Sequence, residues 1–96
     1  MMWLEVIHLR VTDQDYERLM PTFTQLIDKI REKESCRMVK LFRRALLETD
    51  ICLHLYHDSH HPEDGGSPVG LRLVNALKPL GMVHHTVWME IEKTTA

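Results

Sequence analysis

The segment Ile51-Cys52-Leu53-His54-Leu55-Tyr56-His57-Asp58 decides the fold class, because two kinds of side chain alternate along it. On a β-strand, residues i and i+2 point to the same face of the sheet. The odd-numbered positions from Ile51 to Leu55 are therefore on an aliphatic face, whereas His54 and Tyr56 lie on the opposite face. This alternation predicts a strand that helices bury on one side.

Three other segments continue the pattern in the same phase, and we expect them to be strands: Trp3–Val11, Arg37–Arg44 and Val83–Glu92. Their odd-numbered positions are almost purely aliphatic: Ile7, Leu9, Val11, Val39, Leu41, Val83, Val87, Met89 and Ile91. The even-numbered positions, which we call the even face, add these residues to His54 and Tyr56: His8, Arg10, Lys40, Phe42, Arg44, His84, Thr86 and Trp88. A surface of imidazoles, cations and aromatic rings is unusual for a solvated sheet. We therefore expect the function on the even face.

Two helices are expected between these strands. Thr12-Asp13 is a good N-cap pair, and apolar residues recur at helical spacing from there to about Glu34. Pro21 falls inside this pattern, and because the apolar phase continues across it we expect one kinked helix. Ser67-Pro68 opens a second helix, which Pro79 and Gly81 close.

The order of elements is therefore βαββαβ, the ferredoxin-like α+β arrangement, in a single domain of residues 1–96. Right-handed crossovers give a four-stranded antiparallel sheet with spatial order 2-3-1-4 and both helices on its aliphatic face. A hairpin register whose paired positions sum to 94 places Leu41 opposite Leu53 and Lys40 opposite His54. The same register separates Cys36 from Cys52 by about 20 Å, so we expect both thiols to be reduced.

The bare even face also indicates self-association. It carries an apolar and aromatic patch that monomers rarely leave in water: Leu4, Val6, Met38, Phe42, Tyr56 and Trp88. A second copy packed sheet against sheet would cover this patch.

Element order and face polarity together resemble the dimeric α/β-barrel superfamily, which includes antibiotic-biosynthesis monooxygenase-like proteins, muconolactone isomerases and stress-responsive barrel proteins. The stretch Leu71–Trp88, a closed helix followed by Val83-His84-His85-Thr86-Val87-Trp88, is similar to the same part of that group. The resemblance implies a homodimeric barrel with a small-molecule cavity, either between sheet and helices or between the two sheets. No catalytic motif of the group matches residue by residue, so the resemblance assigns no active-site residue.

The candidate site follows from the even face itself. Taking the first and third strands as parallel, we expect His8 to lie near His54 or Tyr56, and Arg10 to lie near His84. Histidine can exchange a proton near neutral pH, tyrosine can donate a hydrogen bond to an oxyanion, and arginine can hold a carboxylate. We therefore assign catalysis and substrate binding to separate subsets. The catalytic residues are His8, His54 and Tyr56, and the substrate-binding residues are Arg10, Phe42, His84 and Trp88.

These residues predict a small-molecule-binding barrel protein, with a cofactor-independent monooxygenase or isomerase activity on an aromatic or polyketide-like substrate. We expect neither a cofactor nor a metal. One alternative is a non-enzymatic structural or sensory dimerisation domain, in which the polar groups bond to each other or to water. A second is a metal or haem site, built across strands from His8, His54 and His84 or from the loop that holds His57, His60 and His61.

Other partners are disfavoured. The net charge is −2 with neutral histidines, and the glycine-aromatic signature of RNA-recognition modules is missing from the third strand, so we expect no nucleic acid. No apolar run approaches the roughly 20 residues that span a bilayer, and the start lacks a signal-peptide pattern. We therefore expect no membrane partner and a cytoplasmic location.

Overall fold

The computed structural model describes residues 2–11, 16–33, 38–46, 49–58 and 65–91. Within these ranges the chain forms four strands and two α-helices in the order βαββαβ. They are β1 (Trp3–Val11), α1 (Tyr16–Lys33), β2 (Met38–Arg43), β3 (Asp50–His57), α2 (Pro68–Leu77) and β4 (Gly81–Met89), and a short 3₁₀ helix, η1 (Lys78–Leu80), links the last two. The predicted order of elements is confirmed.

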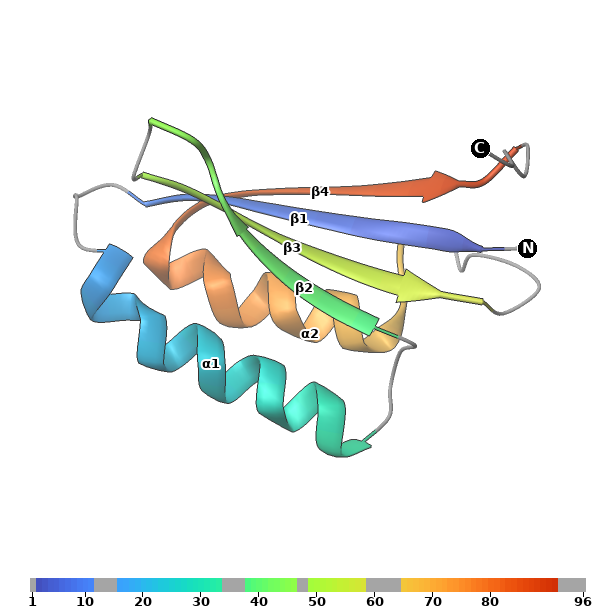
Figure 1. Ribbon diagram of the computed structural model, residues 1–96, viewed down its shortest axis with the longest axis horizontal. Coiled ribbons are helices and arrows are strands. Elements are labelled where there is room, and N and C mark those ends of the chain that lie inside the picture. Colours follow the sequence, from blue (N-terminus) through green and yellow to red (C-terminus); the bar gives the residue numbers. More distant parts are fainter. Residues whose placement is uncertain (1, 12–15, 34–37, 47–48, 59–64, 92–96) are drawn as a thin grey trace.

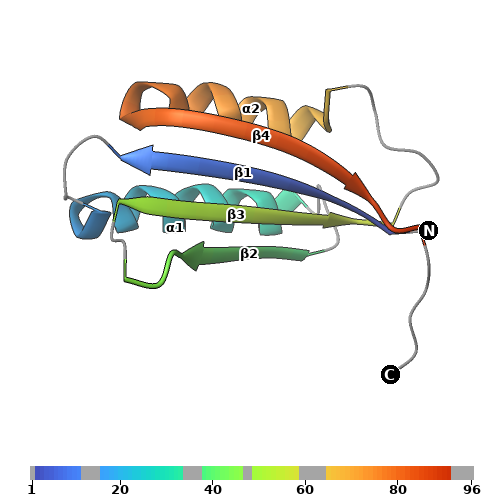
Figure 2. The same cartoon turned by 90° about the horizontal axis from the view of Figure 1, so that it is seen from above.

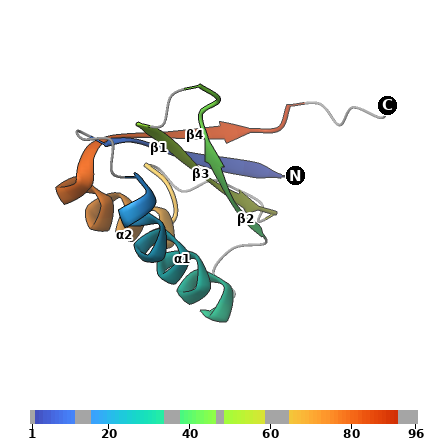
Figure 3. The same cartoon turned by 60° about the vertical axis from the view of Figure 1, so that its left-hand side comes forward.

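The four strands form one sheet in the order β2-β3-β1-β4, and each neighbouring pair is antiparallel. Both helices lie on the same side of the sheet, so no described helix covers the other side (Figures 1 and 3). Helix α1 contacts β2, while α2 contacts β1 and β4, and Figure 2 shows the two helices running side by side behind the strands. The ferredoxin-like α+β fold and its strand order are therefore as predicted.

The expected parallel pairing of the first and third strands is wrong. Strand β1 is antiparallel to both β3 and β4. The reason is geometric: α1 carries the chain back so that β2 runs in the direction of β1, and the hairpin then reverses β3. His8 consequently lies opposite Cys52 on β3 and opposite His84 on β4. His54, an expected neighbour of His8, is two residues away from Cys52 along β3.

The hairpin register was predicted correctly. Leu41 pairs with Leu53 and Lys40 pairs with His54, so aliphatic side chains lie beside aliphatic ones and polar side chains beside polar ones. Strand β1 has the predicted bounds, and the described ends of β2 and β3 differ from the predictions by one residue. Strand β4 begins two residues earlier than predicted, at Gly81, because its pairing with β1 continues as far as Val11. The predicted strand ends Arg37 and Glu92 lie outside the described residues. A Cβ at Gly81 would overlap the backbone carbonyl of Arg10, so glycine is required where the chain rejoins the sheet.

The core lies between the odd-numbered side chains of the sheet and the two helices. It consists of aliphatic side chains and one phenylalanine: Ile7, Leu9, Val11, Phe23, Ile27, Ile30, Val39, Ile51, Leu53, Leu55, Val69, Leu73 and Leu77. Pro21 lies inside α1, which continues past it as one helix. At the start of α2, Pro68 occupies the first turn and the Ser67 side chain accepts a hydrogen bond from the Gly70 amide, as the cap-then-proline pattern predicts.

No helix in the described ranges is long and apolar enough to cross a membrane. Cys52 is a free thiol, and Cys36 lies outside the described residues.

Candidate functional site

An aromatic row crosses the even face between β2 and β3. The ring centroids of Phe42 and His54 are 4.6 Å apart, and those of His54 and Tyr56 are 6.3 Å apart. The Lys40 Nζ lies 5.9 Å from the centre of the Tyr56 ring, at the outer limit of a cation–π contact. The hairpin register therefore brings together three of the predicted site residues, Phe42, His54 and Tyr56.

The imidazole of His54 has an altered protonation equilibrium. Partial burial, and then the positive charge of Lys40 on the paired strand, hold the pKa of His54 below its ordinary value. At neutral pH the ring is therefore neutral and can accept a proton. A neutral imidazole at neutral pH is the form that a general base requires.

Trp88 stands apart from this row. Its side chain is 59% exposed on β4, and its Nε1 donates a hydrogen bond to the Thr86 hydroxyl at 2.9 Å. Leu4 on β1 pairs with Tyr56 on one side and Trp88 on the other, so Leu4 separates the two aromatic side chains.

The other half of the even face is organised by Asp50, at the start of β3. Its buried carboxylate lies 3.0 Å from His8 Nε2 and accepts hydrogen bonds from Arg10 Nε at 3.2 Å and Arg44 Nη1 at 3.3 Å. The hydroxyl of Thr49 donates a further bond at 3.0 Å. Burial alone would raise the pKa of Asp50, but the bonds from Arg10, Thr49, His8 and Arg44 outweigh it and hold that pKa well below its ordinary value.

Arg10 was expected to lie near His84. In the sheet, Arg10 lies opposite Asp50 and Met82, whereas His84 is opposite His8. Because the predicted third strand began one residue later, at Ile51, sequence reasoning missed Asp50. Its even number, two positions before Cys52, was the available signal, since a strand one residue longer puts it on the even face.

A second polar cluster lies on the helix-covered side of the sheet. Glu5 is completely buried, and its carboxylate is 2.7 Å from His57 Nε2 and 2.8 Å from His85 Nε2. The hydroxyl of Ser67, at the start of α2, donates to the same carboxylate. Trp3 stacks on the His57 ring with centroids 4.1 Å apart. The carboxylate thus joins β1 to β3, β4 and α2.

Two glycines leave the space that this cluster occupies. A Cβ at Gly70 would overlap the Glu5 carboxylate, and a Cβ at Gly66 would overlap both that carboxylate and the His85 ring. Burial would raise the pKa of Glu5, but the hydrogen bonds from His57, Ser67 and His85 outweigh this effect and lower it. Glu5 is therefore a buried anion at neutral pH.

The expectation of an almost purely aliphatic odd face is wrong at this end of the sheet. Trp3, Glu5, His57 and His85 all have odd numbers and all point toward the helices. The parity of their numbers was the signal that could have identified them. Their contact depends on three segments that are distant in sequence, which no local pattern reveals.

Neither cluster has the arrangement of a metal site. In the part of the chain that the structure describes, no group of three or more histidine, cysteine, aspartate or glutamate side chains is placed to hold a metal ion. His8 and His84 are directly opposite, but His54 is not in their row. The loop-borne alternative falls largely on residues 59–64, outside the described residues.

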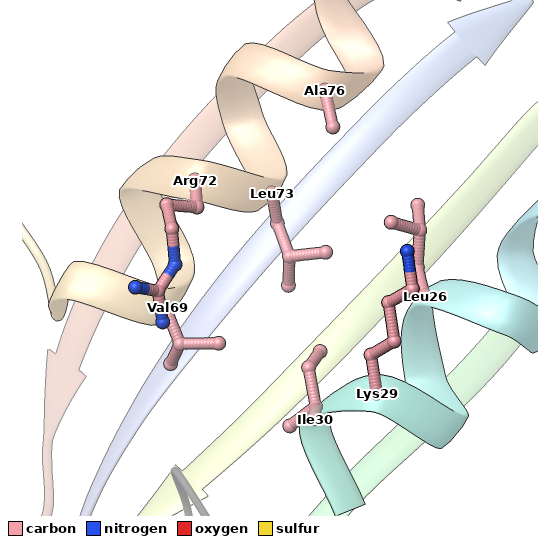
Figure 4. A pocket seen from close by; sticks show the side chains of 7 residues that line it. All are labelled: Leu26, Lys29, Ile30, Val69, Arg72, Leu73 and Ala76. Carbon is pink, nitrogen blue, oxygen red and sulfur yellow. The ribbon is translucent and has the colours of Figure 1, made fainter. Parts of the chain in front are cut away.

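A groove of about 240 Å³ runs between the two helices (Figure 4). Apolar side chains form its walls, and one cation from each helix, Lys29 and Arg72, lies at its rims. Neither cation takes part in an ion pair with another described residue. The groove is a second concave surface that sequence reasoning did not locate by residue.

Solved structures share the fold of this chain over nearly its whole length, and among them are a cofactor-independent oxygenase and an antibiotic biosynthesis monooxygenase. No family model and no curated protein matches the sequence.

Three solved structures illustrate the likeness. Rv0793 from Mycobacterium tuberculosis has a TM-score of 0.70 and 18% identity, and the match covers 99% of this chain and 100% of that one. A variant of SnoaB, a cofactor-independent oxygenase from Streptomyces nogalater, has a TM-score of 0.69 and 14% identity over 96% and 95% of the two chains. An antibiotic biosynthesis monooxygenase has a TM-score of 0.64 and 15% identity over 97% and 100%. At these identities the likeness shows the fold.

Proposed function

We propose that this chain is a homodimeric, small-molecule-binding barrel protein that acts as a cofactor-independent monooxygenase or isomerase on a flat aromatic or polyketide-like substrate. One observation carries the proposal. The imidazole of His54, whose pKa is lowered, lies in an aromatic row on the sheet face opposite the two described helices. The structural likeness to a cofactor-independent oxygenase supports the same reaction class. The expected setting is the cytoplasm.

The apolar character of the even face supports the homodimer. Large hydrophobic side chains on it are strongly exposed in the single chain: Met38, Phe42, Met82 and Trp88. Exposed apolar surface of this kind marks an interaction site, and burying it stabilises a complex by roughly 25 cal/mol for each Å². A second copy would also give the flat face an opposite wall, and a ligand site needs such a wall.

The two candidate reactions share their first step. The neutral His54 removes a proton from a phenol or from a carbon beside a carbonyl group of the substrate. The hydroxyl of Tyr56 donates a hydrogen bond to the oxyanion that forms, and the charge of Lys40 stabilises the same anion. The Phe42 ring holds the flat substrate by stacking, whereas Trp88, three strands away on β4, lies outside this contact.

The second step separates the two reactions. In an isomerase, the proton returns from His54 to a different carbon. In an oxygenase, the deprotonated carbon supplies the electrons for dioxygen and forms a peroxide, which loses water to leave a carbonyl, so a methylene and O₂ give a ketone and H₂O. His8 is the second proton-transfer residue in this scheme, and Arg10 and His84 contact the substrate.

Oxygen consumption with dithranol, a polyketide-like dihydroxyanthrone, tests the proposal. We expect His54→Gln to lower the catalysed rate by about a hundredfold, because loss of a general base typically costs that much, and Tyr56→Phe to lower it by about tenfold. Arg72→Gln, in the groove between the helices, is the matched control and should leave the rate unchanged.

Two results would contradict the proposal. A dimer that neither consumes oxygen nor isomerises or binds any flat aromatic probe would be a structural dimerisation domain. Turnover that survives His54→Gln but is lost in the groove variants Lys29→Gln and Arg72→Gln would move the site to the helix side.

A further inference from the structure

The Asp50 cluster has an unequal number of charges. One buried carboxylate, 2% exposed, is bonded to two guanidinium groups whose side chains are 57% exposed for Arg10 and 56% exposed for Arg44. An ordinary salt bridge pairs one cation with one anion, whereas the described residues of this cluster carry one positive charge in excess even when His8 is neutral. A second anion would balance that charge.

Among the described residues, the two guanidinium groups keep most of their donors unused. Arg10 uses Nε and one Nη2 hydrogen on Asp50, and Arg44 uses one Nη1 hydrogen. Each guanidinium has about five N–H donors. The remaining donors are on exposed side chains, and a carboxylate or phosphate accepts several such bonds at once.

Asp50 also fixes where these donors lie. It is the common acceptor for residues from β1 and from the end of the β2–β3 hairpin, and the Arg44 backbone N–H donates to the Asp50 carbonyl at 3.0 Å. Because the arginines are already held, an incoming anion costs less side-chain entropy than it would on free surface residues. Asp50 is therefore a positioning residue for the pair.

The aromatic row lies further along the same face, within reach of a molecule whose acid group is bound at the two arginines. Cys52 follows Asp50 on the even face at about 7 Å, two residues along the strand, and Phe42 is the partner of Cys52 on β2. The Phe42 ring then contacts His54. A molecule with an acid group at the arginines therefore reaches Phe42 with its first ring and His54 with its second.

We propose that Arg10 and Arg44, held by Asp50, bind the acid group of the substrate, a carboxylate or phosphate carried on a flat ring system that lies along Phe42 and His54. This inference rests on the proposed function for the place of the ring, and it adds the substrate class and the residue Arg44. His84, exposed and directly opposite His8, lies on the same half of the even face.

Titration calorimetry with three probes tests the inference: naphthoate, naphthalenemethanol as its uncharged analogue, and inorganic phosphate. We expect naphthoate to bind about tenfold more tightly than the alcohol, which corresponds to about one charge-assisted hydrogen bond. The double variant Arg10→Gln/Arg44→Gln should lose this advantage, bind phosphate about tenfold more weakly and bind the alcohol as before. Unfolding curves of each variant show whether the fold persists.

Three further variants make the result specific. Arg44→Lys keeps the charge without the planar donor pair and should give an intermediate affinity. Asp50→Asn removes a negative charge, so bulk electrostatics predicts tighter naphthoate binding, whereas loss of positioning predicts weaker binding, which we expect. Lys29→Gln/Arg72→Gln removes the same charge from the helix groove and should change nothing.

The outcomes separate this inference from the proposed function. If naphthoate and the alcohol bind equally and the arginine variants change neither, the anion site is wrong while the ring site stands. If phosphate binding depends on the arginines but neither naphthalene probe binds, the anion site stands and the proposed function fails. Tighter naphthoate binding by Asp50→Asn would overturn the positioning role of Asp50.

Discussion

At the scale of single residues, the surroundings of a side chain decide its chemistry more than its type does. His54 and His57 are three positions apart on one strand. His54 is on the even face, where burial and Lys40 lower its pKa, whereas His57 is buried on the helix side against the Glu5 carboxylate. Only His54 is therefore suited to take a proton from a molecule bound on the open face.

Lys40→Gln tests this assignment. Removing the positive charge takes away one of the two causes that lower the pKa of His54, so that pKa should rise toward its ordinary value while burial still lowers it. The acid limb of the pH–rate profile should therefore move to higher pH. Proton NMR titration of the His54 ring measures the same change without a substrate, and Lys29→Gln is the control. An unchanged His54 titration would contradict the electrostatic role of Lys40.

At the scale of elements, Glu5 joins α2 to the sheet. A carboxylate with no exposed surface is costly to bury, and here donors from β3, β4 and the start of α2 compensate for it. Removing the acceptor leaves the buried donors of His57 and Ser67 and the partly buried His85 unsatisfied, and this penalty exceeds the loss of an ordinary surface ion pair.

We predict that Glu5→Ala lowers the free energy of unfolding by about 3 kcal/mol or more at pH 7. The folded-state pKa of Glu5 is below the ordinary value of 4.5. Its contribution is therefore fully present above pH 4.5 and is lost as the pH falls through the lower, folded pKa. Urea unfolding at neutral and acidic pH should show the gap between wild type and variant shrinking in acid. Glu17→Gln, exposed on α1, should cost less than about 0.5 kcal/mol, and an equal cost for both variants would contradict the role of Glu5.

The β2–β3 hairpin contains a strained residue. Leu46 has a positive φ of 68° and is fully exposed. A side chain in this left-handed region costs about 1–2 kcal/mol, and glycine avoids that cost while losing more entropy on folding. We predict that Leu46→Gly raises the free energy of unfolding by about 0.5–1 kcal/mol, measured by urea unfolding. A loss of stability would show that the leucine side chain contributes a contact that outweighs the strain.

At the scale of the whole molecule, periodicity in the sequence was enough to predict the fold but not the polar clusters. Alternation along Ile51–Asp58 gave the strands their faces, and like-with-like pairing gave the hairpin register. Strand direction was wrong for β1 and β3, so the partners of His8 were wrong as well. Asp50 and Glu5 were missed because their partners come from segments far apart in the sequence, and only the folded sheet brings them together.

The proposed function depends on the assembly of the whole molecule, because it requires a second copy to cover the even face. Phe42 is 44% exposed and Trp88 59% exposed in the single chain. If the face is an interface, Phe42→Glu or Trp88→Glu places a charge in it and should dissociate the dimer, because burying an unpaired charge is strongly unfavourable. Leu71→Glu, on an exposed position of α2, is the control and should leave the assembly intact.

Light scattering on a sizing column, over a range of protein concentrations, tests the claim most directly. We expect a persistent species of twice the 11.3 kDa chain mass, which Phe42→Glu converts to the single-chain mass. A species of 11.3 kDa at every concentration would leave the aromatic row facing water and would contradict the barrel.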